Sequence, residues 1–391
     1  WYAQETEGFR TGARVCNLSY LQTDWYIDQM KRPAYDSPSV PITWKRIDYV
    51  SGTREAVQVY SGVLEDIMGQ LHEAGYSDAD IEERFNGNPF DLTNIIDSWI
   101  LGNNEEVNNI REVIGIDGSI IPTDSIVVTV DKEAVLASGM KIAADSIPDV
   151  MHISLKGRRS IYKSELMMYD MLARTNWVRP MYVALTVGSD NYGDLGKNFV
   201  QEGLVNRITQ FNTEESGVRI DSEKMYDNLM NKFKLGGIDN PDFYLDETVL
   251  RMCYTHRRIF AQLGMQLLRE GKKEQALKLM EKVDKEIPNT TVRHNWHGGS
   301  PDLARIWLAL GKTQKAEDIA DQLGKTACEY LDWYLSLPTR YSKMSTSDVR
   351  YYFWQLQEVS EILSAANSKK ASHYEKAIDR YYGMVAYALT N

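Results

Sequence analysis

The stretch FAQLGMQLLREGKKEQALKLMEKVDKEIP, residues 260–288, decides the architecture of the C-terminal part of the chain. Large apolar and small residues recur in it at three- and four-residue steps, as on one face of a helix. Gly264 and Ala276 are small enough to let two antiparallel helices approach closely. Gly271 supplies a turn between the helices, and Pro288 ends the second helix. The stretch therefore predicts a helical hairpin.

The same spacing returns forty residues later, with Gly311 in the place of Gly271. The second copy lacks the terminal proline and consists of Ala304, Trp307, Gly311, Ala316, Ala320 and Leu323. Both copies match the offsets of a tetratricopeptide repeat. Residues 351–366 and 372–389 predict a third helical hairpin, which lacks the repeat signature and is expected to cap the stack. Residues 257–391 are thus predicted to form an all-α, tetratricopeptide-like helical-repeat domain.

The preceding part of the chain has a mixed pattern. Residues 54–115 are predicted to be mainly helical, with apolar side chains recurring from Ala56 and Val57 onward. Residues 126–130, 150–155 and 181–187 are short, β-branched runs of strand length, and residues 164–173 form an amphipathic helix between the last two. Strand, helix and strand in this order predict a βαβ unit and a small, partly parallel sheet.

The predicted fold class is therefore α+β, followed by helical repeats. We expect four segments along the chain. They are a mainly helical N-terminal segment at 1–119, an α/β sheet unit at 120–215, a connecting segment at 216–256 and the helical repeats at 257–391.

Composition excludes several classes of function. The chain has 391 residues and a net charge of -11, which disfavours nucleic acid as a partner because that binding depends on basic side chains. It has no apolar run long enough to span a membrane. No glycine-rich phosphate loop is present, and we expect no cofactor. His294 and His297 lie close together, but Gly298 and Gly299 indicate a loop there, and we expect no metal.

Two aromatic and charged clusters are candidate binding sites. The first comprises Asp24, Trp25, Tyr26 and Arg32, next to Lys31, and the second comprises Trp177, Arg179 and Tyr182. Aromatic faces stack on apolar ligand surfaces, and arginine binds carboxylates or phosphates. The alternative is that the aromatic rings, with Tyr35, pack the N-terminal segment against the sheet, and that Arg179 pairs a carboxylate. Both interpretations stay open from the sequence.

Seven blocks resemble a family of large multi-pass membrane proteins of certain Gram-negative bacteria, which is related to GT-C protein O-mannosyltransferases. They cover about the first two thirds of the chain in order, at residues 16–36, 88–96, 121–126, 130–135, 164–173, 176–182 and 225–234. The family's membrane helices and acidic catalytic loops are not among them. The resemblance implies a non-catalytic piece of a longer protein, in line with a chain that opens at Trp1, on the periplasmic side of a bacterial membrane. An N-terminal membrane region would attach it there.

Two functions follow as hypotheses. In the first, the chain is the extracytoplasmic C-terminal part of a GT-C-like glycosyltransferase; it contacts the membrane-embedded half and binds a protein acceptor or partner through its repeats. In the second, it is a repeat-containing scaffold without sugar chemistry. Ser125 and Ser146 each stand in an Asp-Ser-Ile triplet that resembles a bacterial O-glycosylation pattern, and they are candidate modification sites.

Overall fold

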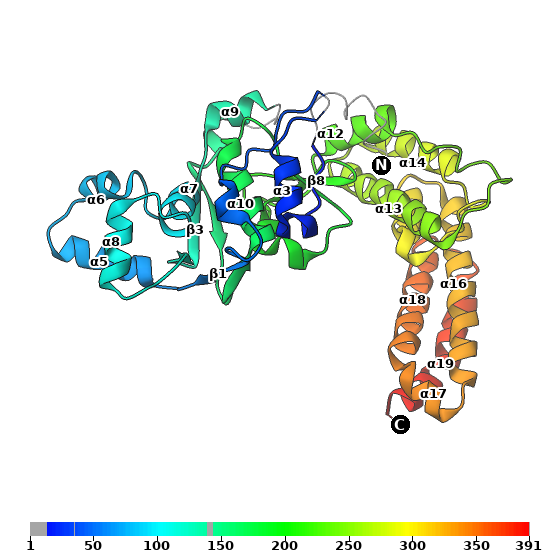
Figure 1. The fold of residues 1–391 in the computed structure, drawn as a ribbon. Coiled ribbons are helices and arrows are strands. Elements are labelled where there is room, and N and C mark those ends of the chain that lie inside the picture. Colours follow the sequence, from blue (N-terminus) through cyan, green and yellow to red (C-terminus); the bar gives the residue numbers. More distant parts are fainter. Residues whose placement is uncertain (1–13, 35, 139–143, 391) are drawn as a thin grey trace. The chain divides into compact units, whose positions relative to one another are not determined.

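The structure is a computed structural model that describes residues 14–34, 36–138 and 144–390. The chain forms two compact units: Trp1–Val200 with Val205–Arg219, and Gln201–Leu204 with Ile220–Asn391 (Figure 1). The first unit mixes helices with small sheets, and the second is helical. The predicted class, α+β followed by helical repeats, is confirmed at this level.

The first unit contains short helices and strands. Its α-helices are α3 (Asp24–Met30), α4 (Arg46–Tyr49), α5 (Val63–Glu73), α6 (Asp78–Phe85), α7 (Leu92–Asn94), α8 (Glu105–Val113), α9 (Lys132–Ala137), α10 (Lys163–Thr175) and α11 (Thr213–Ser216). A π-helical turn, η2 (Ile95–Ile100), continues α7. The strands are β1 (Ala56–Val59), β2 (Ile120–Ile121), β3 (Ser125–Thr129), β4 (Val150–Ser154), β5 (Ser160–Tyr162), β6 (Tyr182–Ala184), β7 (Phe199–Gln201) and β8 (Val205–Ile208).

The strands belong to three small sheets, with the orders β2-β1-β5, β3-β4 and β6-β8-β7. The predicted βαβ unit is wrong, because β4 pairs antiparallel with β3, whereas β6 pairs antiparallel with β8 in another sheet. The intervening helix α10 explains the difference. It is buried on almost all sides, from Lys163 and Glu165 to Leu172 and Thr175, so it is a central helix and does not cover one face of a sheet.

A second correction concerns the start of the region predicted to be helical. Ala56 and Val57 lie in β1, which pairs with β2 in parallel and with β5 antiparallel. Val57 is buried while its neighbours are exposed, as expected for a strand. Four residues are too short a stretch to distinguish this two-residue period from the period of a helix. The rest of that region forms α5, α6, α7 and α8 as predicted, and Asn86 ends α6 in a left-handed conformation.

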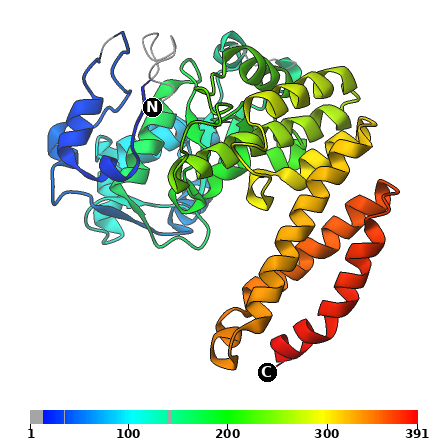
Figure 2. The same cartoon turned by 90° about the vertical axis from the view of Figure 1, so that its right-hand side faces the viewer.

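The second unit is built from helices packed side by side. It contains α12 (Ser222–Asp227), α13 (Glu247–Arg269), α14 (Lys273–Glu286), α15 (Ser300–Ala309), α16 (Thr313–Ser336), α17 (Thr339–Met344), α18 (Thr346–Ala365) and α19 (Ala371–Thr390). Figure 2 shows the long helices α16, α18 and α19 running beside one another, with α17 at their far end. None of the helices in the described residues is both long enough and apolar enough to cross a membrane.

The turns of this unit lie where the repeat pattern places them. Gly271 and Gly311 have φ angles of +75° and +74°, a left-handed conformation that glycine adopts without strain. Helix α14 ends at Glu286, just before Pro288, whereas α16 lacks such a proline and continues to Ser336. Gly264 lies close to α15. A Cβ atom at this position would be only 2.7 Å from Ile306 Cδ1, so a larger residue would not fit without movement.

Gly324 of α16 gives a sharp test of this packing. A Cβ atom there would lie 2.4 Å from the ring of Tyr374, which is buried and donates a hydrogen bond to the Asp321 carboxylate at 2.8 Å. We expect Gly324→Ala to lower the free energy of unfolding by about 1–3 kcal/mol through overpacking. Gly383→Ala in α19, where nothing lies within 4 Å, should raise it by about 0.5–1 kcal/mol. Guanidinium chloride unfolding measures the change in the free energy of unfolding for both variants. A Gly324→Ala variant more stable than wild type would contradict the close contact between Gly324 and Tyr374.

Candidate binding sites

The aromatic residues of α3 have different environments. Trp25 is 55% exposed, whereas Tyr26 lies in the core and its hydroxyl accepts a hydrogen bond from the Asn17 backbone N–H at 2.7 Å. The rings of Tyr20, Trp25 and Tyr26 have centroids 5.5 to 5.9 Å apart, so the three form one cluster. The exposed faces of Tyr20 and Trp25 are the part of this cluster that a ligand could reach.

The charged residues near α3 are not gathered around Trp25. The Asp24 carboxylate lies 3.7 Å from the Arg46 guanidinium, while Arg32 is exposed at the other end of the helix. Lys31 donates a hydrogen bond to the Trp44 carbonyl, and burial lowers its pKa. Tyr35 lies outside the described residues. A ligand-binding role for Asp24, Trp25, Tyr26 and Arg32 stays a prediction.

The second predicted cluster is tied to the backbone. The Trp177 indole N–H donates to the Thr129 carbonyl at 2.8 Å, and Arg179 donates to the Ser39 carbonyl at 3.0 Å. Trp177 and Arg179 line a cavity of about 10 Å³, which holds no more than about one water molecule. Tyr182 lies apart from that cavity and is 40% exposed at the start of β6. Arg179 is half-buried and Tyr182 is exposed, so a ligand larger than water could reach Tyr182 and part of Arg179 without movement of the chain.

Both predicted modification sites are accessible. Ser125 is the first residue of β3, and Ser146 ends the 3-10 turn η3 (Ala144–Ser146); both are exposed. Their modification stays a prediction, which the intact mass of the native protein tests through the mass of an added hexose.

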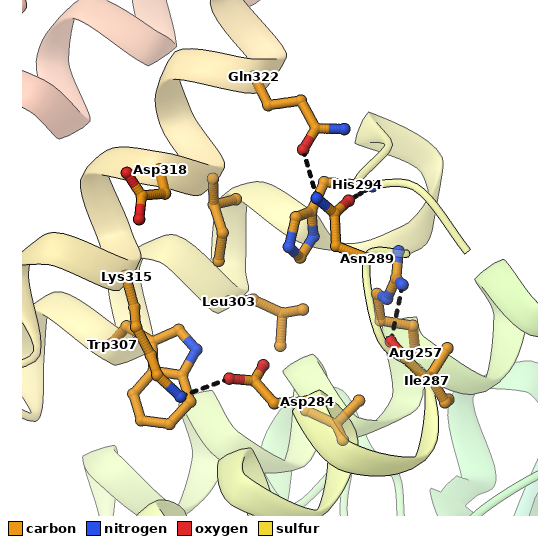
Figure 3. Close-up of a pocket in the computed structure, with 12 residues that line it drawn as sticks. Arg257, Asp284, Ile287, Asn289, His294, Leu303, Trp307, Lys315, Asp318 and Gln322 are labelled. Atoms are coloured by element: carbon orange, nitrogen blue, oxygen red, sulfur yellow. Dashed lines mark hydrogen bonds and ion pairs between the residues drawn. The ribbon is translucent and has the colours of Figure 1, made fainter. Parts of the chain in front are cut away.

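The second unit holds a pocket of about 240 Å³ between α14, α15 and α16 (Figure 3). The Lys315 ammonium lies 2.6 Å from the Asp284 carboxylate and 4.0 Å from the centroid of the Trp307 ring. The Asp318 carboxylate accepts a hydrogen bond from Gln314 at 2.9 Å. The pocket is lined by Arg257, Val283, Asp284, Ile287, Asn289, His294, Leu303, Trp307, Lys315, Asp318, Ile319 and Gln322. It combines an apolar floor with charges of both signs at its edge.

One wall of this pocket is fixed by Arg257 of α13. Its guanidinium is 1% exposed and donates to the carbonyls of Ile287, Val292 and Arg293, the last at 2.9 Å. Burial lowers the pKa of Arg257 to about 10, so the group stays charged at neutral pH. It therefore holds the connection between α14 and α15 as a cation bound to backbone dipoles.

His294, on the same connection, makes the stability of this unit pH-dependent. Burial, with a smaller effect of the Arg257 charge, lowers its pKa from 6.5 to about 3. Between these values the unfolded chain binds a proton that the folded chain does not, so stability falls as the pH falls below about 6.5. The wild-type protein should lose stability between pH 8 and pH 5, and we expect His294→Asn to reduce this loss of unfolding free energy by up to about 2 kcal/mol. Chemical unfolding at both pH values measures this; the exposed His373→Asn is the control and should leave the loss unchanged.

The His294–Gly299 segment is a loop with a short 3-10 turn, Trp296–Gly298. The His294 ring nitrogen Nδ1 lies 3.2 Å from the Ser300 hydroxyl, and His297 Nε2 lies 3.3 Å from the Tyr351 hydroxyl. No three His, Cys, Asp or Glu side chains meet at metal-binding spacing in residues 14–34, 36–138 and 144–390.

The first unit has a separate polar pocket of about 600 Å³. It is built on one of the family-like blocks, residues 88–96, and on the π-helical turn η2, which begins at Ile95 inside that block. Asp97 forms an ion pair with Arg174, and the Asn94 amide donates to the Phe85 carbonyl. The walls are formed by Phe85, Asn86, Gly87, Asn88, Asp91, Thr93, Asn94, Asp97, Ser98, Asn103, Asn104 and Thr129. Most of these polar groups bond within the unit, since the Asp91 carboxylate accepts from Thr93 and Thr129 and the Asn104 amide donates to the Arg84 carbonyl.

The pocket residues of the second unit were not predicted from the sequence. Arg257 stands between His256 and Arg258, and such a basic run is typical of a helix surface. A signal was nevertheless present, because Cys253, Arg257 and Phe260 follow one another at four- and three-residue steps on the apolar face of α13. The pairing of Asp284 with Lys315 had no such signal, since the two residues belong to different hairpins.

Comparison with known proteins identifies a family for this chain. The family model for TMEM260-associated domain 2 matches residues 1–227, more than half of the chain. The chain therefore belongs to the TMEM260-associated domain 2 family. The TMEM260-associated domain is in keeping with a glycosyltransferase-like family of membrane proteins. No curated protein and no solved structure matches the chain.

Proposed function

We propose that this chain is a non-catalytic, extracytoplasmic domain of a bacterial O-mannosyltransferase-like membrane protein, and that its C-terminal helices bind a protein acceptor or partner. An N-terminal membrane region would place it on the periplasmic side, against the membrane-embedded half of the same polypeptide. The family membership supports the glycosyltransferase-like setting. Catalysis would take place in the membrane-embedded half.

The observation that carries partner binding is the pocket of Figure 3. Its edge presents Asp284, Lys315 and Asp318 around an apolar floor with Trp307, and such a mixture suits one long side chain of a bound peptide. We also propose that α13 to α16 are two tetratricopeptide repeats. The glycine turns at Gly271 and Gly311 support this, and stacked repeats of this kind bind proteins along extended surfaces.

A capture experiment tests partner binding. The purified chain, immobilised by its N-terminus, is incubated with extracytoplasmic extract, and the captured proteins are identified by mass spectrometry. The double variant Lys315→Ala and Asp318→Ala removes exposed charges at the pocket edge. It should capture the specific partner at least about tenfold less than the wild-type chain. Asp379→Ala, an exposed helical carboxylate elsewhere on this unit, is the matched control. Equal capture by all three proteins would refute the pocket as the partner site.

The non-catalytic assignment has its own test. The isolated chain is incubated with lipid-linked mannose and acceptor protein, and transfer is followed by mass. We expect no transfer, because the proposal places the reaction in the membrane-embedded half. Sustained turnover by the isolated chain would overturn that assignment.

A further inference from the structure

The negative charge of the protein is concentrated in one part of the first unit. Residues 61–119 contain thirteen acidic and two basic residues, a net charge of -11 that equals the net charge of the whole chain. The remaining residues are neutral together, with 42 acidic and 42 basic residues out of totals of 55 and 44. We call residues 61–119 the acidic lobe. Its helices α5, α6 and α8 lie together at one end of the first unit (Figure 1).

The acidic lobe has a hydrophobic core of its own, which includes Leu64, Phe85 and Trp99. Among the described residues, Arg84 and Glu106 form the one arginine or lysine ion pair inside the lobe, at 3.3 Å. Six other or paired acids lie in first turns of helices, where the helix dipole favours them: Glu65, Asp66, Asp78, Asp80, Glu105 and Glu106. The remaining acids have no such compensation, so like charges repel one another within a small volume. A cationic partner would relieve this repulsion.

The polar pocket of about 600 Å³ belongs to this lobe, which supplies all of its lining residues except Thr129. Three lining residues keep acceptor atoms that bond to nothing in the described part of the chain. One carboxylate oxygen of Asp97 pairs with Arg174 at 2.5 Å, and the other oxygen is open. The Asn103 side chain and the Thr93 hydroxyl are also open. The Asn103 backbone N–H donates to the Asp97 carbonyl at 2.9 Å, so these two residues are neighbours in the pocket.

We propose that the acidic lobe binds a basic peptide segment of another protein, and that one arginine side chain of this segment enters the polar pocket. A guanidinium has five N–H donors in one plane and no acceptor. The open oxygens of Asp97, Asn103 and Thr93 are acceptors of the kind that it requires. The charge of the lobe attracts the other cations of the segment and repels anionic partners such as nucleic acids and acidic lipids. This site is separate from the pocket of Figure 3, which lies in the second unit.

Fluorescence anisotropy with labelled peptides tests the proposal. The full chain is titrated into hexa-arginine, hexalysine and hexaglutamate at low ionic strength. Hexa-arginine should bind most tightly, and hexalysine at least about fivefold more weakly, because an ammonium group lacks the planar set of donors. Hexaglutamate should not bind. Asn103→Ala should remove most of the preference for arginine while changing the affinity for hexalysine by less than about twofold.

Two triple variants of equal net charge separate the acidic lobe from the charge of the whole chain. Glu82→Gln, Glu83→Gln and Glu105→Gln remove exposed charges from the lobe and should weaken binding of both cationic peptides at least about fivefold. The matched control removes three exposed charges from the second unit and should change binding by less than about twofold. It consists of Glu274→Gln, Glu281→Gln and Glu375→Gln.

Circular dichroism checks that each variant is folded. The proposal is overturned if hexa-arginine does not bind the wild-type chain, if the two triple variants weaken binding equally, or if Asn103→Ala keeps the full preference for arginine. Any of these results would leave partner capture at the pocket of Figure 3 untouched, because that assay depends on Lys315 and Asp318 of the other unit.

Discussion

Replacing Arg257 by alanine is expected to lower the free energy of unfolding of the second unit by about 3–5 kcal/mol. The guanidinium is buried and donates to the carbonyls of Ile287, Val292 and Arg293, which close the connection between α14 and α15. Its loss leaves three buried acceptors without a donor, at a cost of about 1 kcal/mol or more each, and opens a cavity. Arg257→Lys should recover only part of the lost unfolding free energy, since one ammonium group cannot reproduce the planar set of N–H donors of the guanidinium.

The neighbouring arginine provides the control for this change. Arg258 is exposed on the same helix, and Arg258→Ala should change stability by no more than about 0.5 kcal/mol. Guanidinium chloride unfolding followed by circular dichroism at 222 nm, a wavelength that reports helix, compares the two variants. Equal effects of Arg257→Ala and Arg258→Ala would show that the three carbonyl contacts do not hold the connection.

A loss of similar size, about 3–5 kcal/mol, is expected from Asp170→Ala in the first unit. Asp170 of α10 is fully buried and accepts hydrogen bonds from the Thr43 backbone N–H at 2.8 Å and from Arg174 at 3.2 Å. Burial raises its pKa, while the bonds from Thr43 and the charge of Arg174 oppose that rise. Removing the carboxylate leaves the Thr43 N–H without an acceptor and takes one of two acidic partners from Arg174. The segment around Thr43 would then detach from α10.

Two further variants make this prediction specific. Asp170→Asn keeps an acceptor oxygen and should cost less than Asp170→Ala. Asp66→Ala removes an exposed carboxylate from α5 and should cost about 0.5 kcal/mol or less. Unfolding is followed by tryptophan fluorescence, because Trp44, next to Thr43, is buried in the core of this unit. If Asp170→Ala and Asp66→Ala unfold at the same denaturant concentration, the buried contact to Thr43 does not stabilise the unit.

Much of the helical architecture could be predicted from local patterns. Helical hairpins recur at a fixed period, and Gly271, Gly311 and Pro288 mark their turns and ends through backbone angles that neighbours in the chain determine. The short strands at 126–130 and 150–155 were also predicted, as β3 and β4. The candidate sites were less predictable. Trp25 is exposed while Tyr26, one position later, is buried, and nothing in their side-chain types distinguishes them.

The sequence by itself determined the turns at Gly271 and Gly311 and the end of α14 before Pro288, since periodicity and special backbone angles are local properties. It did not determine that α13 begins at Glu247, that α16 continues to Ser336 or that α18 begins at Thr346. Only the tertiary structure decided which strands pair, that α10 is buried all round, and that Arg257 points inward to three carbonyls. It also brought Asp284 beside Lys315 and left Trp333 and Met344 exposed. These features depend on contacts between residues distant in the chain, whose free energy comes from burial and from partners that no local pattern specifies.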